Sequence, residues 1–139
     1  MIYLIDNFLD DKLFKSTADH LNNNNYNEYK TPGKSFWVQE AEPEFISNVL
    51  EILSKKEGRE LESVLGFFRV STDVIDSEWR IHSDGIINNE QPDNWRLNTV
   101  LGYEQNRLIS YPANYFHSKY PNKSWKKGRQ VFVMFYKIK

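Results

Sequence analysis

The sequence predicts an α+β fold, in which helices pack on the outside of an antiparallel sheet system. Helical periodicity marks the residues before Ser63, whereas short β-prone runs separated by turns follow it, and this order is typical of α+β proteins. Aromatic residues make up 15% of the chain, which suits a strand-rich core in which large side chains interdigitate between two sheets. The length of 139 residues corresponds to a single domain, expected to span residues 1–139.

The N-terminal segment is expected to form a short strand and then a helix. Residues 1–5 are mostly apolar and strand-prone. Apolar side chains then recur at helical spacing, which predicts a first helix over residues 9–21, with Asp6 or Asn7 capping its N-terminus. Four consecutive asparagines at residues 22–25 predict a loop, because asparagine tolerates the backbone geometries that end helices.

A second strand and a second helix are expected before the chain becomes strand-rich. Residues 31–33, Thr-Pro-Gly, predict a turn, and residues 35–39 are strand-like. Pro43 suits the first turn of a helix and Gly58 its end, and the apolar stripe between them predicts one buried face. The two helices are expected to cover one face of the sheet. Further strands are predicted at residues 64–71, 79–82, 96–103, 107–111 and 130–138.

The composition narrows the classes of partner. Lysine and arginine total 18 against 19 aspartate and glutamate, so the net charge is -1 and no overall basic field exists to attract nucleic acid or an acidic membrane surface. The chain has no cysteine, which leaves nitrogen and oxygen ligands for any metal. Early acidic residues argue against a secretion signal, and no apolar run reaches membrane-spanning length. We therefore expect a cytoplasmic protein that binds neither nucleic acid nor membrane.

Two of the three histidines fall in the strand-rich half, close to a carboxylate. His82 and Asp84 are spaced i, i+2 at the end of a predicted strand, and a strand points such residues to the same face. His117 is the remaining histidine of this half, whereas His20 lies in the first predicted helix. Two histidines and one carboxylate on one face of an octahedron leave adjacent positions open, which is the arrangement of non-haem Fe(II) oxygenases. The sequence thus predicts an Fe(II) site at His82, Asp84 and His117.

A simpler interpretation of the same three residues needs no metal. His82 would cap the end of its strand, and Asp84 would begin a turn with Gly85. His117 would form a hydrogen bond with the backbone. The position of the second histidine after an apolar predicted strand, with a basic residue and its own strand following, favours the metal site.

That basic residue, Arg129, stands at the head of the last predicted strand. Alternation places it on an otherwise apolar strand face, which also carries Val131, Val133 and Phe135. An arginine pointing into an apolar interior is costly unless an anion meets it, and a planar guanidinium binds a carboxylate through two hydrogen bonds. The distal carboxylate of 2-oxoglutarate would satisfy Arg129 while its keto-acid end chelates iron. The alternative is that Arg129 pairs with an acidic residue at the surface.

Together these residues resemble the prolyl-4-hydroxylase-like branch of the Fe(II)/2-oxoglutarate-dependent oxygenases, in particular short members encoded by bacteriophages. The resemblance covers essentially residues 60–139 and depends on the ordered set of His-X-Asp, His and Arg. The segments that carry it are residues 67–70, 79–84, 106–118 and 128–131.

The resemblance implies a fold, a set of cofactors and a reaction. The fold would be a double-stranded β-helix (jelly roll) with N-terminal helices packed on the outer sheet face. His82, Asp84 and His117 would be the iron ligands and the catalytic centre, and Arg129 would bind the carboxylate of 2-oxoglutarate. With dioxygen as the second co-substrate, the enzyme would hydroxylate a peptidyl proline, with another peptide or a small molecule as open alternatives. A phage-encoded enzyme would act in the host cytoplasm.

Two other classes of protein share these features. Only 32 residues lie between Asp84 and His117, and the Gly-Gly-Thr-like hairpin usual in such enzymes has no counterpart there. Val131 also stands where family members often carry serine or threonine. A shortened, non-catalytic, metal-binding jelly-roll module is therefore an alternative. A cupin-like metalloenzyme that uses dioxygen without a keto acid is another, against which Arg129 argues.

Aromatic and basic residues surround the expected site. Tyr111 and Tyr115 precede His117 and are candidates to flank an entrance. The lysines at residues 119–127 are expected to form a solvated loop, with attraction of an acidic substrate or a nucleic acid as the alternative. The apolar wall of the pocket is expected from Phe68, Leu97, Val100, Leu101 and Phe116.

Overall fold

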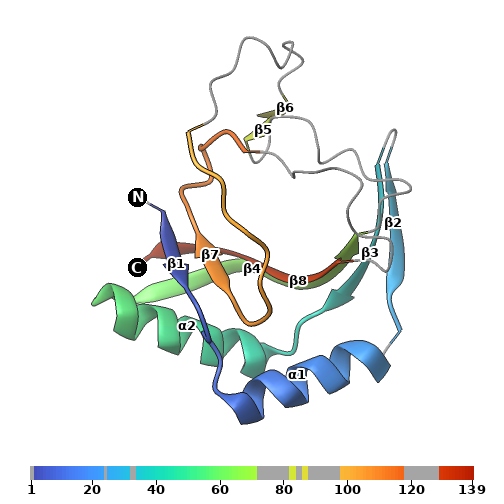
Figure 1. Cartoon of the computed structure of the whole chain (residues 1–139), viewed down its shortest axis with the longest axis horizontal. Coiled ribbons are helices and arrows are strands. Elements are labelled where there is room, and N and C mark those ends of the chain that lie inside the picture. Colours follow the sequence, from blue (N-terminus) through green and yellow to red (C-terminus); the bar gives the residue numbers. More distant parts are fainter. Residues whose placement is uncertain are drawn as a thin grey trace. The chain divides into compact units, whose positions relative to one another are not determined.

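A computed structural model describes residues 2–23, 25–31, 34–71, 82–83, 86–87, 98–117 and 129–139 (Figure 1). The described residues combine helices with antiparallel sheets. The elements in chain order are β1 (Tyr3–Ile5), α1 (Asp11–Asn23), β2 (Asn27–Thr31), β3 (Lys34–Glu40), α2 (Pro43–Glu57), β4 (Leu61–Ser71), β5 (His82–Ser83), β6 (Ile86–Ile87), β7 (Leu108–Ser110) and β8 (Arg129–Ile138).

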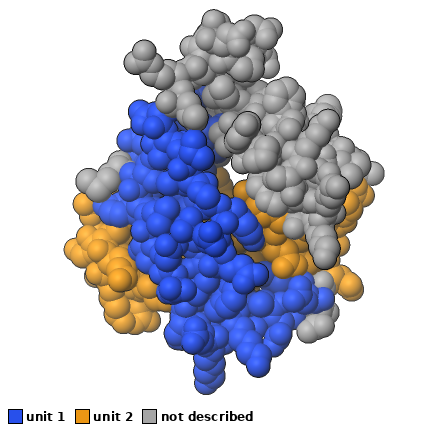
Figure 2. Space-filling model, viewed as in Figure 1, with its two compact units in different colours: residues 1–23, 77–122 blue, residues 24–76, 123–139 orange. Residues whose placement is uncertain are grey.

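The chain divides into two compact units, coloured separately in Figure 2. Unit 1 consists of Met1–Asn23 and Ser77–Asn122, and unit 2 consists of Asn24–Asp76 and Lys123–Lys139. Each unit therefore joins two segments that are distant in sequence. The single domain spanning the whole chain stays a prediction.

The sheet of unit 2 has the strand order β2-β3-β4-β8, with every neighbouring pair antiparallel. Its centre is the long pairing of β4 with β8, which runs from Leu61 opposite Ile138 to Ser71 opposite Arg129. The register shifts once, between Ser63 and Leu65. On either side of this shift, residues two apart along β4 or β8 share a face of the sheet.

Helix α2 packs on one face of this sheet, alongside β4 and β8 (Figure 1). The Phe45 ring meets the Phe132 ring edge to face, with centroids 4.9 Å apart, and lies 5.2 Å from the Phe68 ring. Gly66 allows this close approach, since a Cβ atom built there would lie only 3.1 Å from Cδ1 of Ile46. Buried apolar residues of unit 2 are Val49, Leu53, Leu61 and Phe68.

The predicted boundaries of α2 are confirmed. Pro43 occupies the first turn, where its missing N–H costs no helical hydrogen bond. Gly58 follows the last turn with φ 68°, and its N–H donates to the carbonyl of Ser54 at 2.9 Å. A left-handed residue that returns a hydrogen bond to the last turn is the usual glycine end of a helix.

Helix α1 begins later than predicted and has a different cap. The Asp10 carboxylate accepts a hydrogen bond from the Leu13 N–H at 2.8 Å, so Asp10 caps the helix and the prediction of Asp6 or Asn7 is wrong. Asn7 instead lies in a turn at φ 51°, a region that asparagine tolerates well. The helix also continues to Asn23, through the first two asparagines of the predicted loop.

In unit 1, β1 pairs with β7, with Leu4 opposite Ile109. Asn106, just before β7, ties this sheet to the start of α1. Its side-chain oxygen accepts from the Leu9 N–H at 2.9 Å, and its side-chain amide donates to the Leu9 carbonyl at 2.8 Å. Its own carbonyl accepts from the Phe8 N–H at 3.0 Å. One side chain thereby satisfies both backbone groups of a residue that belongs to no strand.

An ion pair holds the same two segments together. The Arg107 guanidinium donates to both carboxylate oxygens of Asp6, at 2.5 and 3.1 Å, and to the Gly102 carbonyl at 2.8 Å. The hydrogen bond from Arg107 is the main cause that lowers the pKa of the Asp6 carboxyl below 3.8. Asp6 serves as the partner of Arg107 rather than as the cap of α1.

Most strand predictions are confirmed, and one is wrong. Residues 98–103 form no strand, and Val100 is 69% exposed there. Apolar alternation selects a strand only where one of its faces is buried. A strand that was not predicted, β2, forms through pairing with β3. The confirmed strands overlap residues 1–5, 35–39, 64–71, 107–111 and 130–138.

The described strands form three separate sheets, with orders β1-β7, β2-β3-β4-β8 and β5-β6. They do not by themselves show a jelly-roll topology, so the double-stranded β-helix stays a prediction. Helix α2 does cover one face of the sheet of unit 2, as expected for the second predicted helix. In the part of the chain that is described, neither helix has the length and apolar character needed to cross a membrane.

Candidate functional site

The first predicted metal ligand, His82, belongs to a short pair of strands in unit 1. Strands β5 and β6 are antiparallel, with His82 opposite Ile87 and Ser83 opposite Ile86. Two residues, Asp84 and Gly85, connect the paired positions, and Asp-Gly is a sequence that favours tight chain reversals. The backbone of His82 is described as part of β5, whereas Asp84 lies outside the described residues. Their convergence on a metal therefore stays a prediction.

The third predicted ligand, His117, follows β7 in a tightly turned segment of the same unit. The Tyr115 N–H donates to the Pro112 carbonyl at 2.9 Å, which closes the turn. The Nδ1 atom of His117 lies 2.9 Å from the Tyr115 carbonyl oxygen. A carbonyl oxygen accepts but cannot donate, so the proton of this hydrogen bond belongs to Nδ1. In the neutral ring, the lone pair is then on Nε2, the atom that would bind a metal.

A tyrosine further restrains the imidazole of His117. The ring of Tyr111 lies 4.9 Å from it, centroid to centroid, with an angle of 59° between the ring planes. His117 is half-buried, whereas Tyr111 and Tyr115 are 38% and 42% exposed. The ring of His117 is therefore held by a hydrogen bond at one nitrogen and by an aromatic contact. The hydrogen bond of His117 with the backbone, which the metal-free interpretation predicts, is therefore confirmed. It does not conflict with the metal site, because it uses Nδ1 and a metal would bind Nε2.

Within the described ranges, no group of three or more His, Asp, Glu or Cys side chains is assembled to hold a metal ion. That finding covers His117, but not Asp84 or the side chain of His82. A metal site that joins His117 to His82 and Asp84 therefore stays a prediction.

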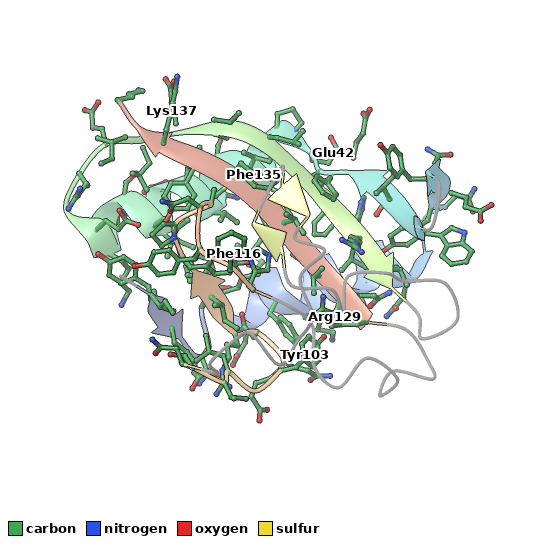
Figure 3. All side chains as sticks on the ribbon, turned by 90° about the horizontal axis from the view of Figure 1, so that it is seen from above. Glu42, Tyr103, Phe116, Arg129, Phe135 and Lys137 are labelled. Carbon is green, nitrogen blue, oxygen red and sulfur yellow. The ribbon has the colours of Figure 1, made fainter. Side chains whose placement is uncertain are left out.

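The predicted co-substrate residue, Arg129, opens β8 in unit 2 and lies opposite Ser71 (Figure 3). Phe132 contacts Phe45 of α2, so its side chain lies on the face of the sheet that α2 covers. Side chains alternate along a strand, so residues an odd number of positions from Phe132 in β8 lie on the opposite face. Arg129 is one of them, together with Val131 and Val133. The Arg129 side chain is half-buried and its Nε atom is shielded from solvent.

Sequence reasoning missed a second arginine on this face. Arg69 of β4 lies opposite Val131 and is only 9% exposed. Phe68, its neighbour, packs under α2, so Arg69 lies on the side away from the helix. The signal was present in the alternation of residues 67–70, where an arginine shares a strand face with Phe67. Its position relative to Arg129 depends on the pairing of β4 with β8, which the sequence does not give.

The predicted apolar wall is wrong in part. Phe68 packs against Phe45 and Phe132 beneath α2, and so lies on the other face of the sheet from Arg129. Val100 is 69% exposed and belongs to no strand. Leu97 lies outside the described residues. Phe68 is therefore a core residue of unit 2 and not part of a pocket wall.

Comparison of the chain with models of protein families, with curated proteins and with solved structures finds no match.

Proposed function

We propose that the protein is an Fe(II)- and 2-oxoglutarate-dependent dioxygenase that hydroxylates an organic substrate. His82, Asp84 and His117 would hold the iron, and Arg129 would bind the distal carboxylate of 2-oxoglutarate. The observation that carries the proposal is the 2.9 Å hydrogen bond between Nδ1 of His117 and the Tyr115 carbonyl. Histidines that bind metals almost always donate their other ring N–H in this way.

The donor set suits Fe(II). Two imidazoles and one carboxylate leave further positions open on an octahedral ion, and the chain offers no thiolate that would favour a softer metal. When bound, the iron would provide the site for the keto acid and dioxygen, and the redox chemistry that couples decarboxylation of 2-oxoglutarate to succinate with hydroxylation of the substrate.

The residues of the chain contribute orientation and charge. The Tyr115 carbonyl fixes the tautomer of His117, and the Tyr111 ring restricts the rotation of the imidazole. Arg129 provides a half-buried guanidinium on a sheet face that also carries Val131 and Val133, and it would bind a carboxylate through two parallel hydrogen bonds. These are the tasks of a protein whose cofactor performs the bond-making steps.

The resemblance to these oxygenases also implies a fold, a location and a class of substrate. The fold would be a double-stranded β-helix made by residues 1–139 as a single domain, active in the cytoplasm, or in the cytoplasm of the host for a phage-encoded enzyme. A peptidyl proline is the substrate class that the resemblance implies. The net charge of -1 gives no reason to include a nucleic acid.

Formation of succinate tests the proposal. The full chain would be incubated with Fe(II), 2-oxoglutarate and dioxygen, with and without proline-containing peptides. We expect succinate to form in amounts that depend on iron, because such enzymes turn over 2-oxoglutarate slowly even without their substrate. Peptides that are substrates should raise the rate of succinate formation. Their mass should increase by that of one oxygen atom.

The same assay separates the proposal from its alternatives. Binding of Fe(II) without any succinate would identify the non-catalytic, metal-binding module, which the short interval of 32 residues between Asp84 and His117 favours. Consumption of dioxygen that does not require 2-oxoglutarate would identify a cupin-like metalloenzyme. Absence of Fe(II) binding would rule out all three.

A further inference from the structure

The imidazole of His117 is held at two points, one of which is the ring of Tyr111. The Nδ1 atom lies 2.9 Å from the Tyr115 carbonyl oxygen. The Tyr111 ring lies 4.9 Å from the imidazole, centroid to centroid, with an angle of 59° between the two planes. This separation and tilt fall in the range of attractive aromatic pairs. The hydrogen bond and the aromatic contact thus restrain the same ring from two directions.

The hydrogen bond by itself leaves the imidazole considerable freedom. The outer side-chain torsion of histidine is broad and roughly two-fold, so the ring can turn over and exchange Nδ1 with a carbon atom. A hydrogen bond also tolerates bending. His117 is only half-buried, so water can compete for the Tyr115 carbonyl. An aromatic ring against the imidazole removes part of this freedom, because rotation of the imidazole would disrupt the contact.

The backbone fixes the position of Tyr111 relative to His117. Tyr111 directly follows β7, which is paired with β1. The next residues form a turn that is closed by the hydrogen bond from the Tyr115 N–H to the Pro112 carbonyl at 2.9 Å. The turn reverses the chain and brings His117 back against Tyr111. All of these contacts lie within unit 1.

We propose that Tyr111 is a positioning residue of the candidate metal site, which keeps the His117 imidazole in its metal-binding orientation before a metal binds. The face of the tyrosine ring performs this role, and its hydroxyl group is not required. A ligand that is already oriented loses less freedom on binding, so removal of its support weakens metal binding. The metal-positioning role rests on the proposed function, whereas the orientation of His117 can be observed without a metal.

The first test uses the metal-free full chain. The ring nitrogens of the three histidines are observed by NMR in mildly alkaline buffer, and those of His117 are assigned through their loss in His117→Ala. We expect the tautomer with the proton on Nδ1 in the wild type and in Tyr111→Phe. Tyr111→Leu should give a mixture of tautomers, because a ring that turns loses the Tyr115 carbonyl. A mixture already present in the wild type would overturn the inference.

The second test is an anaerobic titration of Fe(II) into the same proteins. Tyr111→Leu keeps an apolar side chain without an aromatic ring, and we expect it to weaken Fe(II) binding roughly tenfold. Tyr111→Phe should bind Fe(II) as the wild type does. Equal affinity in Tyr111→Leu and the wild type would overturn the inference. An equal loss in Tyr111→Phe and Tyr111→Leu would overturn it as well, since the hydroxyl group would then be responsible.

Tyr3→Leu is the matched control. Tyr3 is 37% exposed, against 38% for Tyr111, and belongs to β1, where it lies opposite Ser110. Its replacement should change neither the tautomer of His117 nor the Fe(II) affinity. The same losses in Tyr3→Leu as in Tyr111→Leu would show a general loosening of the β1–β7 sheet and would overturn the inference. If Tyr111→Leu does not fold, as judged by circular dichroism, Tyr111→Met takes its place.

The failure of this inference can be told apart from the failure of the proposed function. Fe(II) affinity that does not respond to Tyr111→Leu would remove Tyr111 as a positioning residue and leave the oxygenase, whose own test is the formation of succinate. Absence of Fe(II) binding in the wild type would remove the proposed function, and the metal-positioning role with it.

Discussion

At the scale of single residues, a backbone hydrogen bond fixes the tautomer of His117. Its Nδ1 atom donates to the Tyr115 carbonyl at 2.9 Å, so Nε2 of the neutral ring would be the atom that binds the proposed iron. Tyr111 contacts the ring without forming part of the proposed ligand set. Such a histidine adds little to the packing of a core, and its removal should affect binding more than stability.

Replacement of His117 by alanine should abolish Fe(II) binding and leave the fold intact. A facial set that loses one of three ligands no longer encloses the ion. His82→Ala and Asp84→Ala should do the same. Binding would be measured by anaerobic titration of Fe(II), with wild type expected at one equivalent per chain, and folding by circular dichroism.

The matched control is His20→Ala in α1, which should bind Fe(II) as wild type does because His20 is not a proposed ligand. Wild-type affinity in His117→Ala would show that the triad has been assigned incorrectly.

Arg129 supports a prediction on the co-substrate. Arg129→Ala should weaken 2-oxoglutarate binding at least about thirtyfold, since loss of one partner of a buried charged pair costs roughly 2–5 kcal/mol. The 2-oxoglutarate affinity of Arg129→Lys should lie between those of the wild type and Arg129→Ala, because lysine keeps the charge but lacks the planar pair of donors. The measurement is an anaerobic titration of the Fe(II)-loaded chain, with Fe(II) affinity itself unchanged. Equal 2-oxoglutarate affinity in Arg129→Ala and wild type would leave only a metal-binding protein.

At the scale of elements, the ends of α2 and the pairing of β1 with β7 are determined in different ways. Pro43 and Gly58 act within one turn of the helix they delimit. The pairing of β1 with β7 is reinforced by the ion pair of Asp6 and Arg107, which are 101 residues apart. The role of Gly58 is tested by a substitution that disfavours its backbone conformation. The ion pair of Asp6 and Arg107 is tested by titration with pH.

Gly58→Ala should destabilise unit 2. An alanine at φ 68° pays about 1–2 kcal/mol for the left-handed conformation, and no atom lies within 4 Å of the added Cβ to change that cost. The free energy of unfolding would be measured in urea. Gly102→Ala is the control: its Cβ would meet Arg107 at an ordinary 3.6 Å, so a change within about 0.5 kcal/mol is expected. A cost no larger than that of the control would contradict the role of Gly58.

The Asp6 carboxyl should titrate below 3.8, first because it accepts a hydrogen bond from Arg107. A pKa that is lower in the folded than in the unfolded state means that the ion pair contributes fully above the unfolded pKa and is lost as the pH falls through the folded one. NMR titration of the carboxyl carbon would measure it. Arg107→Gln should raise the pKa of Asp6 above its value in the wild-type protein, because the hydrogen bond that lowers this pKa is removed.

The control for this titration lies in the other unit. The pKa of Glu51 is also lowered, mainly by a hydrogen bond from Lys55 at 2.6 Å, and it should stay unchanged in Arg107→Gln. An Asp6 pKa that does not move in that variant would show that Arg107 is not the cause of the shift.

At the scale of the whole molecule, charge is balanced and the candidate binding groups are local. The net charge of -1 produces no long-range attraction for an anion such as 2-oxoglutarate. We therefore predict that replacing Lys123, Lys126 and Lys127 together by glutamine leaves 2-oxoglutarate affinity unchanged, since solvated charges are screened by salt. The anaerobic titration used for Arg129 measures this. A large loss of affinity would move the carboxylate partner to these lysines, which lie outside the described residues.

Several features could be predicted from the sequence because their causes are local. Proline and glycine mark the ends of α2 directly, and alternation of apolar residues marks β4 and β8. The same alternation places Arg129 on an apolar strand face. His117 was identified by residue type, before its hydrogen bond to Tyr115 could be known.

Other features could not be predicted because several local solutions compete. Asp6, Asn7 and Asp10 are all good helix caps, and the choice of Asp10 goes together with the pairing of Asp6 with a distant arginine. Strand β2, Asn27–Thr31, is polar and has no apolar alternation, and its pairing with β3 makes it a strand. In residues 98–103 the pattern suggested a strand, but side chains such as Val100 are exposed.

The sequence by itself determined the kinds of residue available for chemistry: two histidines and a carboxylate in the strand-rich half, an arginine at the head of the last strand, and no thiol. Only the tertiary structure decided that Arg69 lies beside Arg129. The physical reason is the range of the interactions involved. Periodicity and capping act over a few residues, whereas the strand register aligns Arg69 with Val131, 62 positions away, through backbone hydrogen bonds that any sequence can form.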